Sequence, residues 1–248
     1  MIGEEFTNTV KNCKSCARCN EYGENSVAIE DSLGTVLVIG ESPAYAEQLT
    51  EKPFSGIKEV MASKCGSCIN ATHCFNGLLS SSSSRRVTYT GCIGFTPGVS
   101  PLNPGVKLRT AGQILDDMLG YFGFTRPDWN QKGIMVHCSN SAQCCSSPDE
   151  KPLAEQINIC SSQFLKPFLI DEIYPPERRI ILGRYAWYAV TGVHPKSVVR
   201  MGGQFHEGIG YLIPHPSYVQ YNPPFLTEYS KMFYNIATNL IGRLQAHE

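Results

Sequence analysis

The sequence lacks a strong excess of charge of either sign, and it lacks any long apolar run. Its 21 Lys and Arg residues are balanced by 22 Asp and Glu residues, so the formal net charge is −1 at pH 7. A protein that meets nucleic acid over much of its surface is usually strongly basic, so any such contact here requires a local patch. No segment reaches the roughly 18 consecutive apolar residues typical of a membrane helix. We therefore predict no membrane span.

The sequence also lacks the features of an exported, disordered or fibrous chain. Residues 1–10 are acidic rather than a basic stretch leading into an apolar run, which favours a cytoplasmic location. With 42% apolar residues and no periodic glycine, the composition excludes disorder and collagen-like repeats. A length of 248 residues fits one domain, 1–248, with room for an inserted module.

Cysteine is unusually abundant. The sequence has 11 cysteines, and in a chain without export features, paired cysteines more often bind metals or clusters than form disulfides. Three pairs have metal-binding spacing: the overlapping Cys13-x-x-Cys16 and Cys16-x-x-Cys19 near the start, and Cys65-x-x-Cys68 further along. We therefore expect cysteine-bound metal.

Short apolar runs alternate with longer amphipathic segments along the chain. Runs of three to five β-favouring residues, too short for helices, predict buried parallel strands at 35–39, 134–138, 179–182 and 211–213. Apolar residues at helical spacing predict helices at about 113–122, 153–170, 185–190 and 228–244. This alternation predicts the α/β class: a central four-stranded parallel sheet flanked by helices, with ligands beyond the carboxyl ends of its strands.

Residues 57–109 interrupt this alternation. The segment combines a serine run, an Arg-Arg pair and a Pro/Gly-rich stretch, so it has little material for a core of its own. Small modules of this kind usually need a metal to fold. Its four cysteines, Cys65, Cys68, Cys74 and Cys92, predict a structural zinc site. A second iron-sulfur cluster and plain buried thiols are the alternatives.

Polar residues directly follow three of the predicted strands. Glu41 comes after the first strand, Asn140 after the second and His215 after the last, and Phe54 follows the first strand at a short distance. Taken singly, each polar residue has a purely structural explanation: a helix cap, a turn residue and a buried histidine. The carboxyl ends of parallel strands meet at one edge of the sheet, so together they predict a site for a flat polar ligand.

Several short motifs follow one another in a fixed order. They are Asn12-Cys13-x-x-Cys16, Val38-Ile39-Gly40-Glu41-x-Pro43, Pro53-Phe54-x-Gly56, Ala111-Gly112-Gln113-Ile114-Leu115, Asn140-x-x-x-Cys144, Cys160, Ile181-Leu182-Gly183 and His215-Pro216-Ser217-Tyr218. As an ordered set they resemble the family 4 uracil-DNA glycosylases, the iron-sulfur branch of the uracil-DNA glycosylase superfamily. The resemblance spans nearly the whole chain except residues 57–109. It implies an α/β/α sandwich and a DNA repair enzyme that acts as a monomer.

The resemblance also implies a cofactor. In that family four cysteines hold a 4Fe-4S cluster of structural role, and the matching positions here are Cys13, Cys16, Cys144 and Cys160. Thiolates suit iron-sulfur clusters, although zinc on the same four thiolates is the alternative. Cys19 and Cys145 neighbour the proposed ligands, so the choice among them rests on the resemblance.

Site roles are implied in the same way. Asn140 would read the N3–H and O4 of uracil with its amide, and Phe54 would stack on the base. Glu47 would lie near C5 and disfavour thymine. His215 would donate a hydrogen bond to the developing O2 anion, and Glu41 would orient the attacking water. Further substrate-binding positions are Ser42 and Ser217.

The implied reaction hydrolyses the N-glycosidic bond of a flipped uracil and leaves an abasic site. It calls for no lysine, so we expect a monofunctional glycosylase, with lyase activity left open. The chain departs from the family pattern at Ser42 and Ala44, where glycines are usual. This departure and the 57–109 insertion support two alternatives: a glycosylase for another modified pyrimidine in DNA, and a catalytically weak DNA-binding module of the same fold.

Overall fold

The computed structural model describes residues 4–17, 34–43, 47, 54, 111–126, 133–144, 151–170 and 173–245. The predicted module at 57–109 lies outside these residues, together with Cys65, Cys68, Cys74 and Cys92. Cys19 and Cys145 also lie outside them. The zinc site of the insertion therefore stays a prediction.

The described strands form one six-stranded sheet in the order β2-β3-β1-β4-β6-β5. Neighbouring strands are parallel except β5, which pairs antiparallel with β6. Their bounds are β1 Val36–Gly40, β2 Phe124–Thr125, β3 Ile134–Asn140, β4 Arg179–Leu182, β5 Gln204–His206 and β6 Gly210–Ile213. The α/β fold predicted from the sequence is confirmed.

The four predicted strands are the four central ones, and the sheet extends one strand further at each edge. The edge strands β2 and β5 have only two and three residues, too few to show a period of two. In β5 the residues are also partly or fully exposed, so no apolar run marks it.

Helices surround the sheet. The α-helices are α1 Glu4–Lys11, α6 Ala111–Tyr121, α7 Ala154–Phe164, α8 Gly183–Thr191, α9 Val198–Met201, α10 Pro216–Tyr221 and α11 Leu226–Gln245. The described part of the chain also has short 3-10 helices, η2 Lys166–Phe168, η3 Pro176–Arg178 and η4 Pro223–Phe225. The helix predicted at 153–170 is divided into α7 and η2. Pro167 lies at the start of η2, and a proline cannot donate the backbone hydrogen bond that a continuing helix needs.

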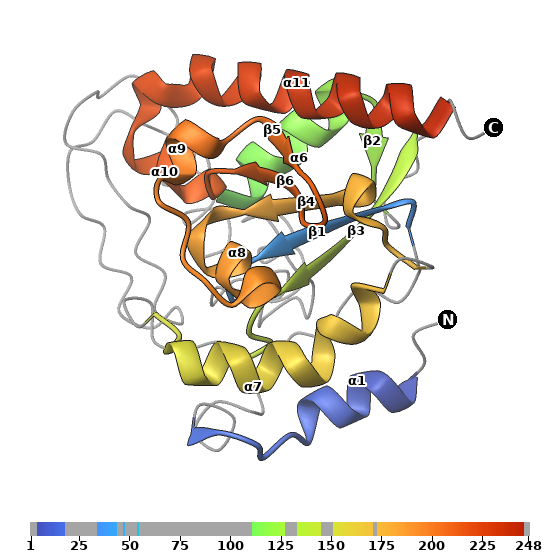
Figure 1. Ribbon diagram of the computed structural model, residues 1–248, viewed down its shortest axis with the longest axis vertical. Helices are drawn as coiled ribbons and strands as arrows, with labels where there is room; N and C mark the ends of the chain where they lie inside the picture. Colours follow the sequence, from blue (N-terminus) through green and yellow to red (C-terminus); the bar gives the residue numbers. More distant parts are fainter. Residues whose placement is uncertain are drawn as a thin grey trace, which may run out of the picture.

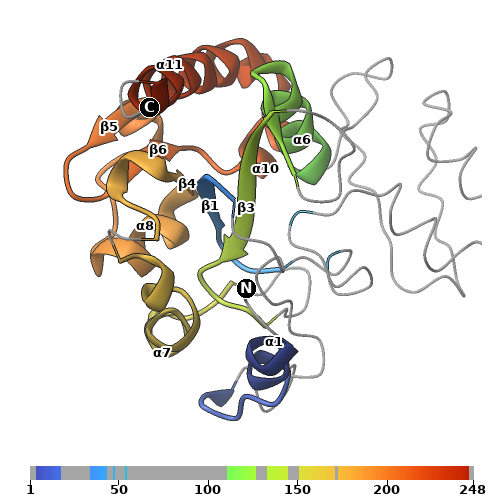
Figure 2. The same ribbon diagram turned by 90° about the vertical axis from the view of Figure 1, so that its right-hand side faces the viewer.

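Two apolar cores lie on opposite faces of the sheet. Alternate residues of β1 separate them: Val36 and Val38 pack with α6 and α11, whereas Leu37 and Ile39 pack with α7 and α8. Figure 2 shows this arrangement, with α6 and α11 on one side of the sheet and α7 and α8 on the other. Burial on both faces explains why β1 has no polar side chain.

All strands except β5 run in one direction, so their carboxyl ends gather at one edge (Figure 1). The chain order reverses around β1, because β3 lies on one side of it and β4 on the other. Ligands of open α/β sheets bind beyond the carboxyl ends at such a reversal.

Of the helices that the structure describes, none has the length and apolar character needed to cross a membrane.

Candidate functional site

The ends of β1 and β3 are tied together by backbone and side-chain hydrogen bonds. The Gly40 carbonyl accepts from the Ser141 N–H at 2.9 Å, and the Glu41 carbonyl accepts from the Ala142 N–H at 3.0 Å and from the Ser141 hydroxyl. The register places Gly40 directly opposite Asn140. The sequence-predicted pair of Glu41 and Asn140 is therefore brought to one edge of the sheet.

The side-chain amide of Asn140 is buried. The residue is 1% exposed, and among the residues that the structure describes neither its side-chain nitrogen nor its side-chain oxygen has a hydrogen-bond partner. An unpaired buried polar group costs roughly 1–3 kcal/mol, and native proteins rarely retain one without a reason. The planar Asn140 amide thus has one unused donor and one unused acceptor, which can hydrogen-bond to the edge of a polar ligand.

Gly40 allows the Phe54 ring and the Asn140 amide to meet. A Cβ atom at position 40 would collide with Phe54 Cζ and with Asn140 Oδ1. Any larger residue would push the ring and the amide away from the strand. Gly40 of the Val38-Ile39-Gly40-Glu41 motif thus leaves the space in which the Phe54 ring lies beside the Asn140 amide.

Phe54 adopts a strained backbone conformation. Its φ is +55°, a region that is rare for bulky residues and that persists only when the surroundings enforce it. Two side chains hold it in place: Glu47 accepts a hydrogen bond from the Phe54 N–H, and Arg126 donates to the Phe54 carbonyl at 3.4 Å. The structure thus shows Glu47 buried against the backbone of Phe54.

Sequence reasoning missed Arg126. It is 1% exposed and pairs with Asp116 of α6 at 3.2 Å as well as with Phe54. An arginine after the two-residue strand β2 carries no recognisable signal in the sequence, because its partners lie 10 and 72 positions away. Arg126 connects α6 to the segment that presents the aromatic ring.

Replacing Arg126 by methionine is expected to lower the free energy of unfolding by about 2–3 kcal/mol. The substitution keeps an unbranched side chain but removes charged hydrogen bonds to Asp116 and to the Phe54 carbonyl. Urea denaturation of both proteins measures the difference. Lys231→Met is the control, because Lys231 contacts Glu228 at 3.8 Å with both side chains more than half exposed. Such surface pairs contribute about 0–1 kcal/mol, and equal losses in the two variants would contradict the role given to Arg126.

His215 has a defined hydrogen-bonding state. Its Nδ1 accepts from the Ser217 N–H at 3.3 Å and lies 2.8 Å from the Ser217 hydroxyl. Because a backbone N–H can only donate, Nδ1 is the acceptor and the proton of the neutral ring is on Nε2. The Nε2–H remains as a donor, and the ring centroid of Phe54 lies 6.2 Å from that of His215.

Gly183 makes room for His215. Its φ is +87°, and a Cβ there would lie 3.0 Å from the Cβ of His215. Both the backbone conformation and the close approach require glycine at the start of α8. The glycine of the Ile181-Leu182-Gly183 motif therefore helps to place the imidazole at the carboxyl edge of β6.

The neutral form of His215 is favoured by its surroundings. Although the residue keeps some exposure, burial, with a smaller contribution from the charge of Lys151, lowers its pKa from 6.5 to about 4. At pH 7 the ring is therefore uncharged and donates from Nε2. A neutral donor suits the stabilisation of an anion that forms on a substrate only during the reaction.

The depressed pKa of His215 predicts a loss of stability on acidification. The unfolded chain binds a proton near pH 6.5 and the folded chain only near pH 4, so the free energy of unfolding falls between these values by up to about 3 kcal/mol. Denaturation at pH 7, 6, 5 and 4 measures this slope. His215→Asn, which does not titrate, is expected to show a smaller fall over the same range. An identical slope in the variant would show that other groups cause it.

Glu41 forms an ion pair that the sequence did not indicate. The Nζ of Lys151 lies 2.9 Å from Glu41 Oε1, and 15% of the Glu41 side chain is exposed against 63% of the Lys151 side chain. Lys151 precedes α7 in the chain, and a lone lysine before a proline in a loop gives no signal of such a contact. Two further predicted binding residues lie next to these groups. Ser42 directly follows Glu41 and is half-buried. The Ser217 hydroxyl contacts the ring of His215.

The four predicted cluster ligands lie together below the site. Cys13, Cys144 and Cys160 are buried in one small core with Val10 and Phe164, and Cys16 packs against it. All four are thiols. Burial, with smaller contributions from the other three sulfurs, raises the pKa of Cys160 to about 12. The chain thus brings Cys13 and Cys16 together with Cys144 and Cys160 in one core.

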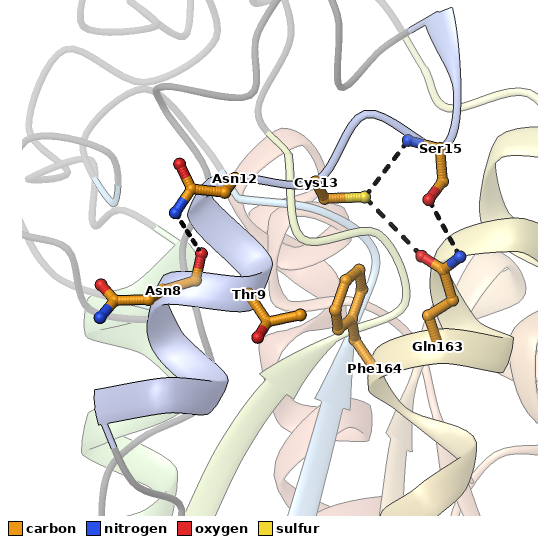
Figure 3. Close-up of a pocket in the computed structure, with 7 residues that line it drawn as sticks. All are labelled: Asn8, Thr9, Asn12, Cys13, Ser15, Gln163 and Phe164. Carbon is orange, nitrogen blue, oxygen red and sulfur yellow. Dashed lines mark hydrogen bonds between the residues drawn. The ribbon is translucent and has the colours of Figure 1, made fainter.

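Hydrogen bonds surround two of these sulfurs. Cys13 Sγ accepts from the Ser15 N–H at 3.5 Å and lies 3.7 Å from Gln163 Oε1, and Gln163 in turn donates to the Ser15 hydroxyl at 2.9 Å. Figure 3 shows this arrangement at the edge of an open pocket between α1 and α7. Cys160 Sγ accepts from the Gln143 N–H at 3.2 Å. Backbone N–H donors of this kind stabilise sulfur in its thiolate form.

Gln143 links the cysteine core to Asn140. Its backbone N–H donates to Cys160, while its side-chain nitrogen donates to the Asn140 carbonyl at 2.7 Å. No sequence motif singles out Gln143, which is an unspecified position of Asn140-x-x-x-Cys144. Among the described residues, however, no group of three or more His, Cys, Asp or Glu side chains forms a ready-made metal site. The four thiols share one core, but they do not surround one point as the ligands of a single metal ion do.

Fold and site together define a class of protein. An α/β sheet presents a buried planar amide, an aromatic ring and a neutral imidazole at the carboxyl ends of its strands, which suits the recognition of a heterocyclic base. In agreement, residues 30–237 match the model of the Uracil DNA glycosylase superfamily. The match covers most of the chain, and the chain belongs to that superfamily.

Membership makes the protein a DNA glycosylase that removes damaged bases from DNA by hydrolysis, as part of DNA repair. A comparison with curated proteins finds no significant match. The superfamily predicted from the sequence is thus confirmed.

Proposed function

We propose that the protein is a uracil-DNA glycosylase of the iron-sulfur type. The observation that carries this proposal is Asn140, whose buried amide offers an unused donor and an unused acceptor beside the Phe54 ring. Uracil presents an N3–H donor next to an O4 acceptor, which matches an amide, whereas cytosine presents an acceptor next to an amino donor. With its oxygen facing N3–H and its nitrogen facing O4, the Asn140 amide would accept uracil and mismatch cytosine.

The base must leave the duplex to reach this amide. The flipped uracil would lie against Phe54, whose strained backbone is fixed by Glu47 and Arg126. A preorganised ring avoids the entropy cost of ordering it when the base arrives. Glu47, which accepts a hydrogen bond from the Phe54 N–H, would crowd the 5-methyl group of thymine.

Bond cleavage separates charge, with a cation developing on the sugar and an anion on the departing base. The Nε2–H of His215 would donate to uracil O2 as the anion forms, because Nδ1 is occupied by Ser217. Donors of this kind contribute about 3–4 kcal/mol. Glu41 would hold the attacking water and stabilise the cationic sugar. The water then adds to C1′, and the abasic site and free uracil are released.

The experiment that tests this proposal uses a duplex oligonucleotide with a single uracil. Abasic sites formed by the protein are converted to strand breaks by alkali and quantified on a denaturing gel. Uracil-dependent breaks from the wild-type protein, reduced strongly in Glu41→Gln, support the proposal. Equal activity of Glu41→Gln and wild type would show that Glu41 does not orient the water, and no uracil-dependent breaks at all would refute the proposed substrate.

We propose further that Cys13, Cys16, Cys144 and Cys160 hold a 4Fe-4S cluster. Four thiols from two distant segments share one core, and backbone N–H groups donate to two of the sulfurs. Four soft thiolates suit a cluster of this kind. When bound, the cluster would serve as a structural cross-link that joins α1 to the segment carrying Asn140, through Gln143 and Cys160.

Replacing Cys160 by serine is expected to abolish iron and sulfide binding and to lower the melting temperature. The cause is the loss of one of four ligands in the core that joins α1 to α7. Iron and acid-labile sulfide are quantified on protein purified without oxygen, together with the absorption spectrum. Cys138→Ser is the matched control, because Cys138 is also buried but lies in β3 within a different core. Zinc in place of iron in the wild-type protein, or equal iron in both variants, would contradict the assignment.

A further inference from the structure

The segment at the end of β3 carries Asn140 at one end and Cys144 at the other, and all five of its residues are buried. Buried backbone groups cannot be satisfied by bulk water, so they need partners within the protein. The backbone N–H groups of three successive residues in this segment donate to the Gly40 carbonyl, the Glu41 carbonyl and Cys160 Sγ. The segment is therefore held between the candidate site and the cysteine core.

The side chain of Gln143 closes this segment onto Asn140. Its Nε2 donates to the Asn140 carbonyl at 2.7 Å and to the Ser139 hydroxyl at 3.3 Å. Gln143 is 2% exposed, and its Oε1 has no hydrogen-bond partner among the residues that the structure describes. An unpaired buried oxygen is costly, so the presence of an amide at this position is explained by its nitrogen. The nitrogen fixes the peptide group of Asn140.

We infer that Gln143 is a positioning residue, which holds the Asn140 amide in the place where it reads the base. The inference rests on the proposed function, because it takes Asn140 as the residue that recognises uracil. Among the described residues, no hydrogen bond to the Asn140 side chain itself fixes its position. Packing over Gly40 beside the Phe54 ring and the position of its own backbone must therefore place it. A misplacement of about 1 Å is enough to cost on the order of 10²-fold in rate.

Stability alone does not explain a glutamine at position 143. Methionine has a similar length and no branch, but it cannot donate to the Asn140 carbonyl. Gln143→Met would leave that carbonyl unpaired while removing the unpaired Oε1, so one buried acceptor without a partner replaces another. The backbone N–H of residue 143 would still donate to Cys160 Sγ. The variant is therefore expected to keep the melting temperature and the bound metal of the wild-type protein.

The test compares the binding of two duplexes that differ in one base. Each carries one 2′-fluorinated nucleotide, which resists hydrolysis, with uracil in one duplex and cytosine in the other. Fluorescence anisotropy gives both Kd values, and their ratio is the base preference. The cost of opening each base pair is the same for every protein variant, so a change in the ratio comes from the protein. Gln163→Met is the matched control, because Gln163 also lies at the cysteine core but donates to Ser15.

The expected result is a preference for uracil in the wild-type protein and in Gln163→Met that falls about tenfold in Gln143→Met, as for the loss of one hydrogen bond. Binding of the cytosine duplex should be equal in all three proteins. An unchanged preference in Gln143→Met overturns the inference and leaves the proposed function standing. Equal weakening of both duplexes, or a melting temperature lower than that of Gln163→Met, overturns it by making Gln143 a structural residue. No preference in the wild-type protein refutes the proposed base reading and this inference together.

Discussion

Replacing Asn140 by alanine is expected to reduce the release of uracil from DNA on the order of 10⁴-fold. The flipped base would enter the site with its N3–H and O4 facing no partner, and a buried polar edge without partners is costly. Single-turnover kinetics on a uracil-containing duplex measure the loss. Asn158→Ala is the control, because Asn158 is an exposed amide on α7 that donates to the Tyr188 hydroxyl of α8 at 3.0 Å. We expect this variant to release uracil at the wild-type rate.

The same substitution should leave stability unchanged or increase it. Both polar atoms of the Asn140 side chain are buried without partners in the free protein, so their removal relieves a cost while creating a small cavity. Activity and stability would then change in different directions, as occurs where a site is reserved for a ligand. A melting temperature that falls in parallel with the rate would show instead that Asn140 is a structural residue.

Replacing His215 by alanine is expected to lower the rate of bond cleavage by about 10²–10³-fold. The variant loses the Nε2–H donor to the departing base, while the Asn140 amide and the Phe54 ring still bind it. The chemical step should therefore slow while DNA binding is retained. Rapid-quench kinetics measure the rate, and fluorescence anisotropy measures the binding of labelled DNA.

Ser217→Ala separates donation by His215 from its positioning. The variant removes one hydrogen bond to Nδ1 but keeps the Ser217 backbone N–H, which donates to the same atom. A loss of about fivefold is expected, corresponding to one neutral hydrogen bond. If Ser217→Ala and His215→Ala had equal effects, the tautomer assigned to His215 would be wrong. If His215→Ala lost DNA binding together with the rate, the residue would bind DNA rather than assist cleavage.

The central fold was predictable because its strands are buried on both faces. In β1, for example, every residue is buried, and this continuous apolar run distinguishes it from a half-exposed strand. The candidate site residues Glu41, Asn140 and His215 could be singled out for the same reason, because each comes shortly after such a run, and their roles stay predictions. The motif glycines Gly40 and Gly183 received a physical explanation only from the structure, where each lies against a site side chain.

Other parts of the site could not be predicted because they depend on tertiary contacts. Arg126, Gln143 and Lys151 have ordinary sequence surroundings, and their roles arise from partners in other elements. The positive φ of Phe54 is likewise enforced by its neighbours rather than by its own residue type. The short edge strands β2 and β5 were missed because pairing with a longer strand, not their sequence, defines them.

The most direct test of the central claim is the identity of the base that the protein releases. Matched duplexes that carry one uracil, 5-hydroxymethyluracil, thymine or cytosine are incubated with the protein, and the free bases are measured by mass spectrometry. Recognition by the Asn140 amide predicts release of uracil, with thymine and cytosine retained. Release of 5-hydroxymethyluracil but not of uracil, or tight DNA binding without release of any base, would contradict the account.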